Sequence, residues 1–123
     1  TFDQFRYGFA NAVSEEEAHH LYETFHVPAP GRPLFQAATA NLDFTTEAKA
    51  DKSNPDRGPM LLVSGGKDHI VPWKLANAAY KQQRKNKVVT EIIEMKGRGH
   101  ALTIDSGWKE VADTALAFVK RFV

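Results

Sequence analysis

The most informative part of the sequence is the apolar run MLLVS, residues 60–64, together with the stretch GGKDHIVP, residues 65–72, that follows it. A short apolar run closed by two glycines and followed by a proline is typical of a buried strand that ends in a loop, with a helix after the loop. We therefore predict a strand over 60–64 and a helix that begins at Pro72. The loop between them presents the carboxylate of Asp68.

A second strand and loop have the same arrangement. The residues VVTEIIEM, 88–95, are rich in β-branched side chains, and GRGHA, 97–101, presents His100 before a further helical pattern. The order strand, helix, strand, helix predicts an α/β fold with two parallel strands, flanking helices and a right-handed crossover. Ligands of such sheets bind at the carboxyl ends of the strands, so Asp68 and His100 are predicted to meet there. An acid and a histidine in this position are two members of a hydrolytic triad.

The spacing of apolar residues predicts the helices of this second part. The helix that begins at Pro72 ends in the basic run 81–87, and a last helix runs from Trp108 to the C-terminus. The apolar positions of the first of these helices are Leu75, Ala76, Ala79 and Tyr80. Glu91 and Glu94 indicate that the second strand lies near an edge of the sheet.

The beginning of the chain is helical by pattern. Phenylalanines recur at helical spacing at Phe2, Phe5 and Phe9. A second helix is predicted over Glu15–Phe25, with a capping box in which the Ser14 hydroxyl accepts from the Glu17 amide and the Glu17 carboxylate reaches back.

Prolines and polar residues divide the chain after this helix. The stretch VPAPGRP, 27–33, stops the second helix, and Pro33 begins a third, through Ala38. Residues 43–58 are polar and irregular, as in a linker. The predicted organisation is a helical segment over 1–42, a linker over 43–58 and a βαβα part over 59–123.

The composition restricts the class of protein. With 123 residues, of which 42% are hydrophobic and 25% charged, one modest core is expected. A net charge of +1 and the lack of a long apolar stretch argue against nucleic acid and membrane as partners, and favour small molecules, such as a substrate, or other proteins. Without cysteine or a secretory signal, we expect a cytoplasmic protein. Because the chain begins with Thr1, we expect an excised piece or a processed product.

These residues resemble the last two strand–helix units of an α/β-hydrolase, in which the acid follows the penultimate strand and the histidine follows the last. The matching motifs are SGGKDHIVP, 64–72, and GRGH, 97–100. The helical segment 1–42 is similar to the cap of a bacterial subgroup of these enzymes, so that the resemblance covers nearly the whole chain. It implies that Asp68 orients the imidazole and that His100 is the general base.

The chain departs from this family in one large respect. The family carries a Gly-x-Ser-x-Gly elbow upstream, and no such pattern occurs here. We therefore expect a C-terminal portion of a serine-type, esterase-like or lipase-like hydrolase, inactive alone because its nucleophile lies outside the chain. One alternative is an aspartate nucleophile, as in dehalogenase-like or epoxide-hydrolase-like members. Another is a non-catalytic interaction module that reuses half of the fold.

Other polar groups favour less specific interpretations. His69 is interpreted as a surface or packing residue, and the basic run 81–87 as the solvated end of a helix. A metal site is not expected at the histidines of the second helix, because His-Glu-x-x-His is absent, and no cofactor is expected. These histidines and their acidic neighbours are Glu16, His19, His20, Glu23 and His26.

The short sheet itself predicts an interaction. Two parallel strands leave one sheet edge and much apolar surface unpaired. We therefore expect the isolated chain to self-associate through the strand at 60–64.

Overall fold

The computed structural model describes residues 1–48 and 50–123. The secondary-structure elements of this part are α1 (Phe2–Gly8), α2 (Glu15–Phe25), α3 (Arg32–Thr39), the 3₁₀ helix η1 (Ala40–Leu42), β1 (Met60–Gly65), α4 (Trp73–Gln83), β2 (Thr90–Met95) and α5 (Trp108–Val119). Each predicted helix and strand is present. Most ends agree with the predicted ones to within two residues, and the last helix stops at Val119, before the C-terminus.

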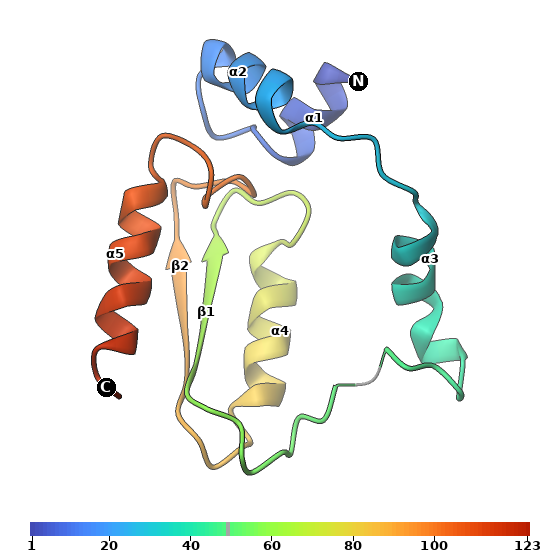
Figure 1. The fold of residues 1–123 in the computed structure, drawn as a ribbon, viewed down its shortest axis with the longest axis vertical. Helices are drawn as coiled ribbons and strands as arrows, with labels where there is room; N and C mark the ends of the chain where they lie inside the picture. Colours follow the sequence, from blue (N-terminus) through green and yellow to red (C-terminus); the bar gives the residue numbers. More distant parts are fainter. Residues whose placement is uncertain (49) are drawn as a thin grey trace.

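The two strands form a parallel pair, as predicted. Met60 lies opposite Thr90 and Gly65 opposite Met95. Helix α4 packs against both strands and α5 against β1, and Figure 1 shows the two helices on opposite sides of the strand pair. Since the strands run in the same direction, both end at the same edge, where the loops that carry Asp68 and His100 begin. Each strand has a single neighbour within the described residues, so the predicted edge position of β2 is confirmed.

Helices α1 and α2 form an N-terminal helix pair, residues 1–26, over the carboxyl ends of the strands (Figure 1). Aromatic contacts hold the two helices together. Phe2 stacks on His19 with ring centroids 3.7 Å apart, and Phe5 meets Tyr22 edge to face at 5.3 Å. The phenylalanines predicted to share one helix face therefore serve mainly to join α1 to α2.

The prediction for the start of α2 is correct for Ser14 and wrong for Glu17. Ser14 Oγ accepts from the Glu17 amide at 3.1 Å. The Glu17 carboxylate, however, points away from Ser14 and accepts from the amide of Ser106 at 2.5 Å and from its hydroxyl at 2.9 Å. Two donors from a neighbouring loop satisfy both carboxylate oxygens, whereas the backbone amide of Ser14 would satisfy one.

Most of the buried apolar residues in the described part of the chain form two small clusters, where the composition predicted one core. The first lies between the N-terminal helix pair and the loop after β2, and contains Ala10, Ala18, Leu21 and Ala101. The second lies between the strands and α5, and contains Met95, Leu102 and Val111, with Val63 packed against them. Ala101 and Leu102 are consecutive and enter different clusters, so the backbone next to His100 is held from two sides.

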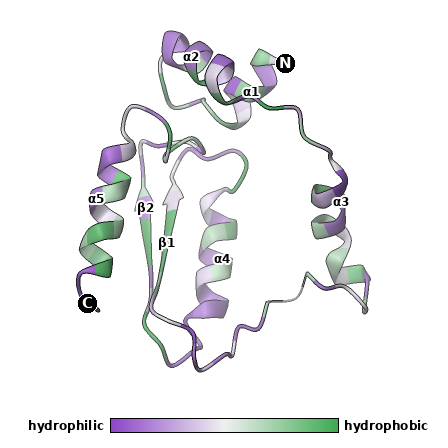
Figure 2. Ribbon diagram, in the orientation of Figure 1, coloured by the Kyte–Doolittle hydropathy of each residue, from purple (hydrophilic) through white to green (hydrophobic). Residues whose placement is uncertain are grey.

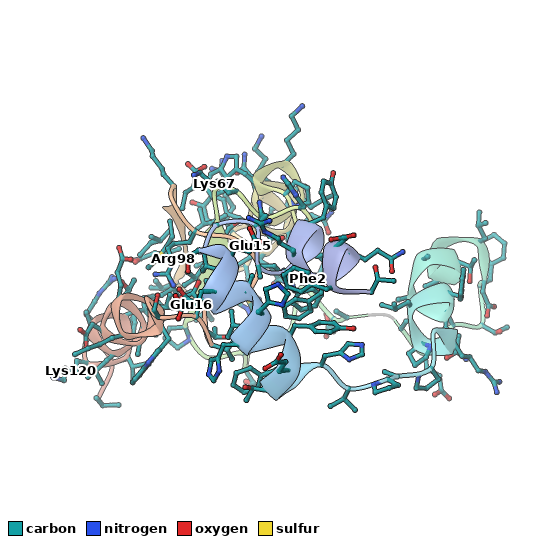
Figure 3. The ribbon with its side chains drawn as sticks, turned by 90° about the horizontal axis from the view of Figure 1, so that it is seen from above. Phe2, Glu15, Glu16, Lys67, Arg98 and Lys120 are labelled. Atoms are coloured by element: carbon teal, nitrogen blue, oxygen red, sulfur yellow. The ribbon has the colours of Figure 1, made fainter. Side chains whose placement is uncertain are left out.

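Helix α3 lies apart from the rest of the molecule, as the views from the side and from above agree (Figures 1 and 3). Among the described elements it contacts only η1. Leu34 and Phe35 are 75% and 73% exposed. Exposed apolar residues also occur in the hydrophobic C-terminal half of α5, at Leu116 and Val119 (Figure 2).

Candidate functional site

The carboxylate of Asp68 is held by the loop that follows β1. One oxygen, Oδ1, accepts from the amides of Ile70 at 2.7 Å and Val71 at 2.8 Å. The other, Oδ2, lies 2.9 Å from Nδ1 of His100. Asp68 is only 8% exposed. One oxygen thus organises the turn ahead of α4, and the other is directed at the imidazole.

The environment of Asp68 keeps it ionised. Burial acts to raise the pKa of the Asp68 carboxyl, but the hydrogen bonds from Val71, His100 and Ile70 and the charge of His100 act in the opposite direction and outweigh it. The pKa of Asp68 is therefore lowered from its ordinary value. An ionised carboxylate only accepts hydrogen bonds, so Nδ1 of His100 carries a proton; when the imidazole is neutral, Nε2 carries the lone pair.

His100 follows β2 and is partly open to solvent, with 28% of its side chain exposed. Phe9 directly follows α1, and its ring packs edge to face against the imidazole of His100, with ring centroids 4.6 Å apart. Among the described residues, no protein group hydrogen-bonds to Nε2 of His100. The nitrogen that would act as a base is therefore free to accept a proton from a group that approaches it.

The two loops come together because their backbones touch. The amide of Lys67 donates to the carbonyl of Arg98 at 2.9 Å, and the amide of Gly66 donates to Met95 at the end of β2 at 2.9 Å. A Cβ on Gly65 would lie 2.6 Å from the Arg98 carbonyl oxygen, so only glycine permits this approach. The glycines that indicated the end of a strand thus also allow Asp68 to reach His100.

The N-terminal helix pair contacts both loops of the candidate site. Asn11 Nδ2 donates to the Lys67 carbonyl at 2.8 Å, and the Ala101 amide donates to the Phe9 carbonyl at 3.0 Å. The local sequence places Phe9 on an aromatic helix face, but it does not predict that Phe9 or Asn11 contacts these loops, because a local pattern does not determine which loops a residue meets after folding.

His69 has a separate role, next to Asp68 but directed away from His100. Its Nδ1 lies 2.8 Å from the carbonyl oxygen of Tyr7, and its ring packs against the Tyr7 ring with centroids 4.5 Å apart. This agrees with the interpretation of His69 as a packing residue, at the contact between the loop and α1.

The other side chains that could bind a metal ion or act as a nucleophile are not combined with His100 in the described part of the chain. In the described part of the chain, no three His, Cys, Asp or Glu residues are arranged to hold a metal ion. The four serines all lie within the described residues: Ser14 caps α2, Ser53 bonds to Asp51, Ser106 bonds to Glu17, and Ser64 is buried with no hydrogen-bond partner for its hydroxyl. No serine hydroxyl is therefore bonded to His100.

A cavity of about 800 Å³ lies at the other end of the molecule, between the linker and the end of α4. Its lining residues are Lys52, Ser53, Pro55, Gln82, Lys85, Asn86 and Lys87. The negative end of the α4 dipole accounts for cations there, and the cavity has no acid–base pair. Acid–base chemistry is therefore better assigned to Asp68 and His100 than to this cavity.

Comparisons with protein-family models, with curated proteins and with solved structures find no match for this chain. None of the described helices has the length and apolar character that crossing a membrane requires.

Proposed function

We propose that this chain supplies the acid and the general base of a serine-type hydrolase of the α/β-hydrolase class, with esterase-like or lipase-like chemistry on a small-molecule substrate. The observation that carries the proposal is the contact of 2.9 Å between Asp68 Oδ2 and His100 Nδ1, at the carboxyl ends of two parallel strands. Buried carboxylates of this kind hold an imidazole in one tautomer and stabilise the cation that forms when it takes a proton.

In this proposal, Nε2 of His100 takes the proton of the nucleophile and later gives it to the leaving group. Asp68 remains ionised throughout, which agrees with the lowered pKa of its carboxyl. The nucleophile comes from a segment outside the described residues, because three of the four serines have other contacts and the fourth, Ser64, is buried and makes no hydrogen bond to His100. In this proposal, the site is complete only when the segment that carries the nucleophile lies next to Nε2 of His100.

The test compares the complete product of the gene that encodes this chain with its variants, using hydrolysis of p-nitrophenyl acetate. His100→Ala is expected to lower the rate by roughly 10²–10⁴-fold, which is the usual contribution of a positioned general base. His20→Ala is the matched control, because His20 is an exposed histidine on α2 outside the candidate site. Full activity of His100→Ala would refute the assignment of the base.

The nucleophile of the complete gene product is identified with a fluorophosphonate probe. The probe labels an activated serine, and mass spectrometry then identifies the modified peptide. An aspartate nucleophile would give no such label, and would instead take up ¹⁸O from labelled water during a single turnover. The 123-residue chain alone is expected to be inactive. Turnover by the isolated chain would show that the nucleophile lies within it, contrary to the proposal.

A further inference from the structure

The loop that carries His100, residues 96–107, needs an element that fixes its conformation. It contains Gly97, Gly99 and Gly107, and glycine has more backbone freedom than any other residue. Most of the loop has no regular secondary structure. A general base must nevertheless be held close to its productive geometry, because small misplacements have large effects on rate.

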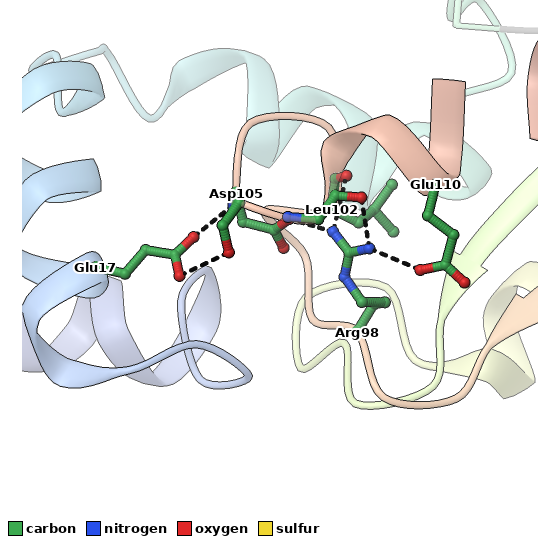
Figure 4. A network of polar contacts seen from close by, with 7 residues as sticks. Glu17, Arg98, Leu102, Asp105 and Glu110 are labelled. Atoms are coloured by element: carbon green, nitrogen blue, oxygen red, sulfur yellow. Dashed lines mark hydrogen bonds and ion pairs between the residues drawn. The ribbon is translucent and has the colours of Figure 1, made fainter. Parts of the chain in front are cut away.

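The guanidinium of Arg98 provides such an element by crossing the loop from the inside (Figure 4). It donates to the Leu102 carbonyl at 3.3 Å and to the Gly107 carbonyl at 2.8 Å, and it is paired with the carboxylate of Asp105. A Cβ on Gly107 would collide with the guanidinium. One side chain thus joins the beginning, the middle and the end of the loop.

His100 lies midway between Arg98 and Leu102, two residues that the Arg98 side chain connects. On one side, the Arg98 carbonyl accepts from Lys67, next to Asp68. On the other side, the Arg98 guanidinium holds the Leu102 carbonyl. The backbone is therefore held two residues before His100 by a main-chain hydrogen bond and two residues after it by the arginine side chain, and neither contact involves the imidazole itself.

The burial of the Arg98–Asp105 pair is difficult to explain by stability alone. The two side chains are 14% and 3% exposed. Removing two charges from water costs several kcal/mol per ion, and a well-packed apolar pair is often at least as stable. An apolar pair could not, however, form the polar contacts seen here. Arg98 donates to two backbone carbonyls, and Asp105 Oδ1 accepts a hydrogen bond from the Gly107 amide at 3.0 Å. The polar pair is suited to imposing one loop conformation.

We propose that Arg98 and Asp105 are positioning residues for His100: they keep the imidazole at hydrogen-bond distance from Asp68 by tying the backbone that follows His100 to residue 98, which precedes it. The inference rests on the proposed role of His100 as the base. It concerns the geometry of the imidazole, however, and is measurable without turnover.

The test is nitrogen-15 NMR of the imidazoles of the full 123-residue chain at neutral pH. In the unmodified chain, His100 is expected to show a slowly exchanging Nδ1–H proton and a single tautomer. In Arg98→Gln, exchange of that proton is expected to accelerate by about tenfold or more, as for the loss of one charge-assisted hydrogen bond. The signals of His69, which is bonded to Tyr7, should not change.

Arg121→Gln is the matched control. Arg121 forms a bidentate pair with Glu91, with both distances 2.7 Å, near the start of β2 and away from the loop. A structural arginine without a positioning role should leave the His100 proton unchanged. If Arg121→Gln accelerates its exchange as much as Arg98→Gln does, or if Arg98→Gln leaves it unchanged, the proposal is refuted.

If Arg98→Gln does not fold, the exchange of the His100 Nδ1–H proton is measured in Arg98→Lys instead. Lysine keeps a charge opposite Asp105 but lacks the planar fork that reaches two carbonyls, so an intermediate acceleration is expected. If Arg98→Lys is folded and its His100 proton exchanges as in the unmodified chain, the proposal is refuted. An inactive gene product with a well-fixed His100 would instead refute the proposed function and leave the positioning role standing.

Discussion

Two side-chain atoms from residues 32 positions apart, His100 Nδ1 and Asp68 Oδ2, lie 2.9 Å from each other at the carboxyl ends of β1 and β2. The contact depends on a close approach of two loop backbones at Gly65 and on the amides of Ile70 and Val71, which hold the other carboxylate oxygen. Both requirements are met by the chain itself, so the contact between Asp68 and His100 forms without any further segment.

Replacement of Asp68 by asparagine tests the orientation of the imidazole. An amide in place of Oδ2 would present a donor to Nδ1 and favour the wrong tautomer. In the complete gene product, Asp68→Asn is expected to lower esterase activity by roughly 10⁴-fold, with little change in KM. Asp3→Asn, on the exposed first turn of α1, serves as the control and should retain activity.

Asp68 also predicts how stability depends on pH. The folded-state pKa of its carboxyl is lowered, so its contribution is present above the ordinary pKa of aspartate, about 3.9, and is lost as the pH falls through the folded value. Urea midpoints of the unmodified chain and Asp68→Asn should therefore differ at pH 7 and converge below about pH 4. The hydrogen bond from Arg121 also lowers the pKa of Glu91. This group is present in both the unmodified chain and Asp68→Asn, so its effect cancels in the difference between their urea midpoints. A constant difference across this range would contradict the prediction.

Removal of Asp105 tests the energetic weight of the buried ion pair. Asp105→Ala leaves the Arg98 guanidinium largely buried, with only the exposed Glu110 as a carboxylate partner at 3.1 Å. We expect a loss of about 3 kcal/mol in the free energy of unfolding, measured by urea titration. Asp113→Ala breaks the exposed pair with Lys109 and should cost less than about 1 kcal/mol. Equal losses in the two variants would contradict this prediction.

Glu17→Ala tests the connection between α2 and the His100 loop. The variant removes both hydrogen bonds to Ser106, and we expect weaker docking of the N-terminal helix pair by roughly 1–3 kcal/mol. Hydrogen exchange of the Ala101 amide, which donates to the Phe9 carbonyl, should accelerate, while the amides of β1 should not change. Glu16→Ala is the control, since Glu16 lies in the same first turn of α2 and interacts equally with the helix dipole.

Self-association of the isolated chain remains a prediction, with the unpaired edge of β1 as the proposed contact. Sedimentation velocity over a dilution series is expected to show a species larger than a monomer. Leu61→Lys should shift the equilibrium toward monomers by placing a charge in β1. The corresponding change on the exposed side of α3, Leu34→Lys, should have no such effect. A monomer at all concentrations, or dissociation caused only by Leu34→Lys, would exclude the β1 edge as the contact.

Local patterns in the sequence were sufficient to predict the secondary structure and the proximity of Asp68 and His100. The strand at 60–65 and helix α2 follow from apolar spacing, glycines and caps, which act over a few residues. The order of strands and helices was enough to predict a parallel pair, and therefore that Asp68 and His100 share one edge of the sheet.

Contacts between distant segments required the tertiary structure. The capping pattern predicts a bond from Glu17 to the start of its own helix, but Glu17 bonds Ser106. The rings of Phe9 and His100 are in contact although no sequence pattern links the two residues. Nothing in the local sequence around Arg98 indicates that its guanidinium lies among Leu102, Asp105 and Gly107. Periodicity and capping are properties of neighbouring residues, so they predict which elements form and where strands end. The partner of a long charged side chain depends on which loops pack together, and that is determined only when the whole chain has folded.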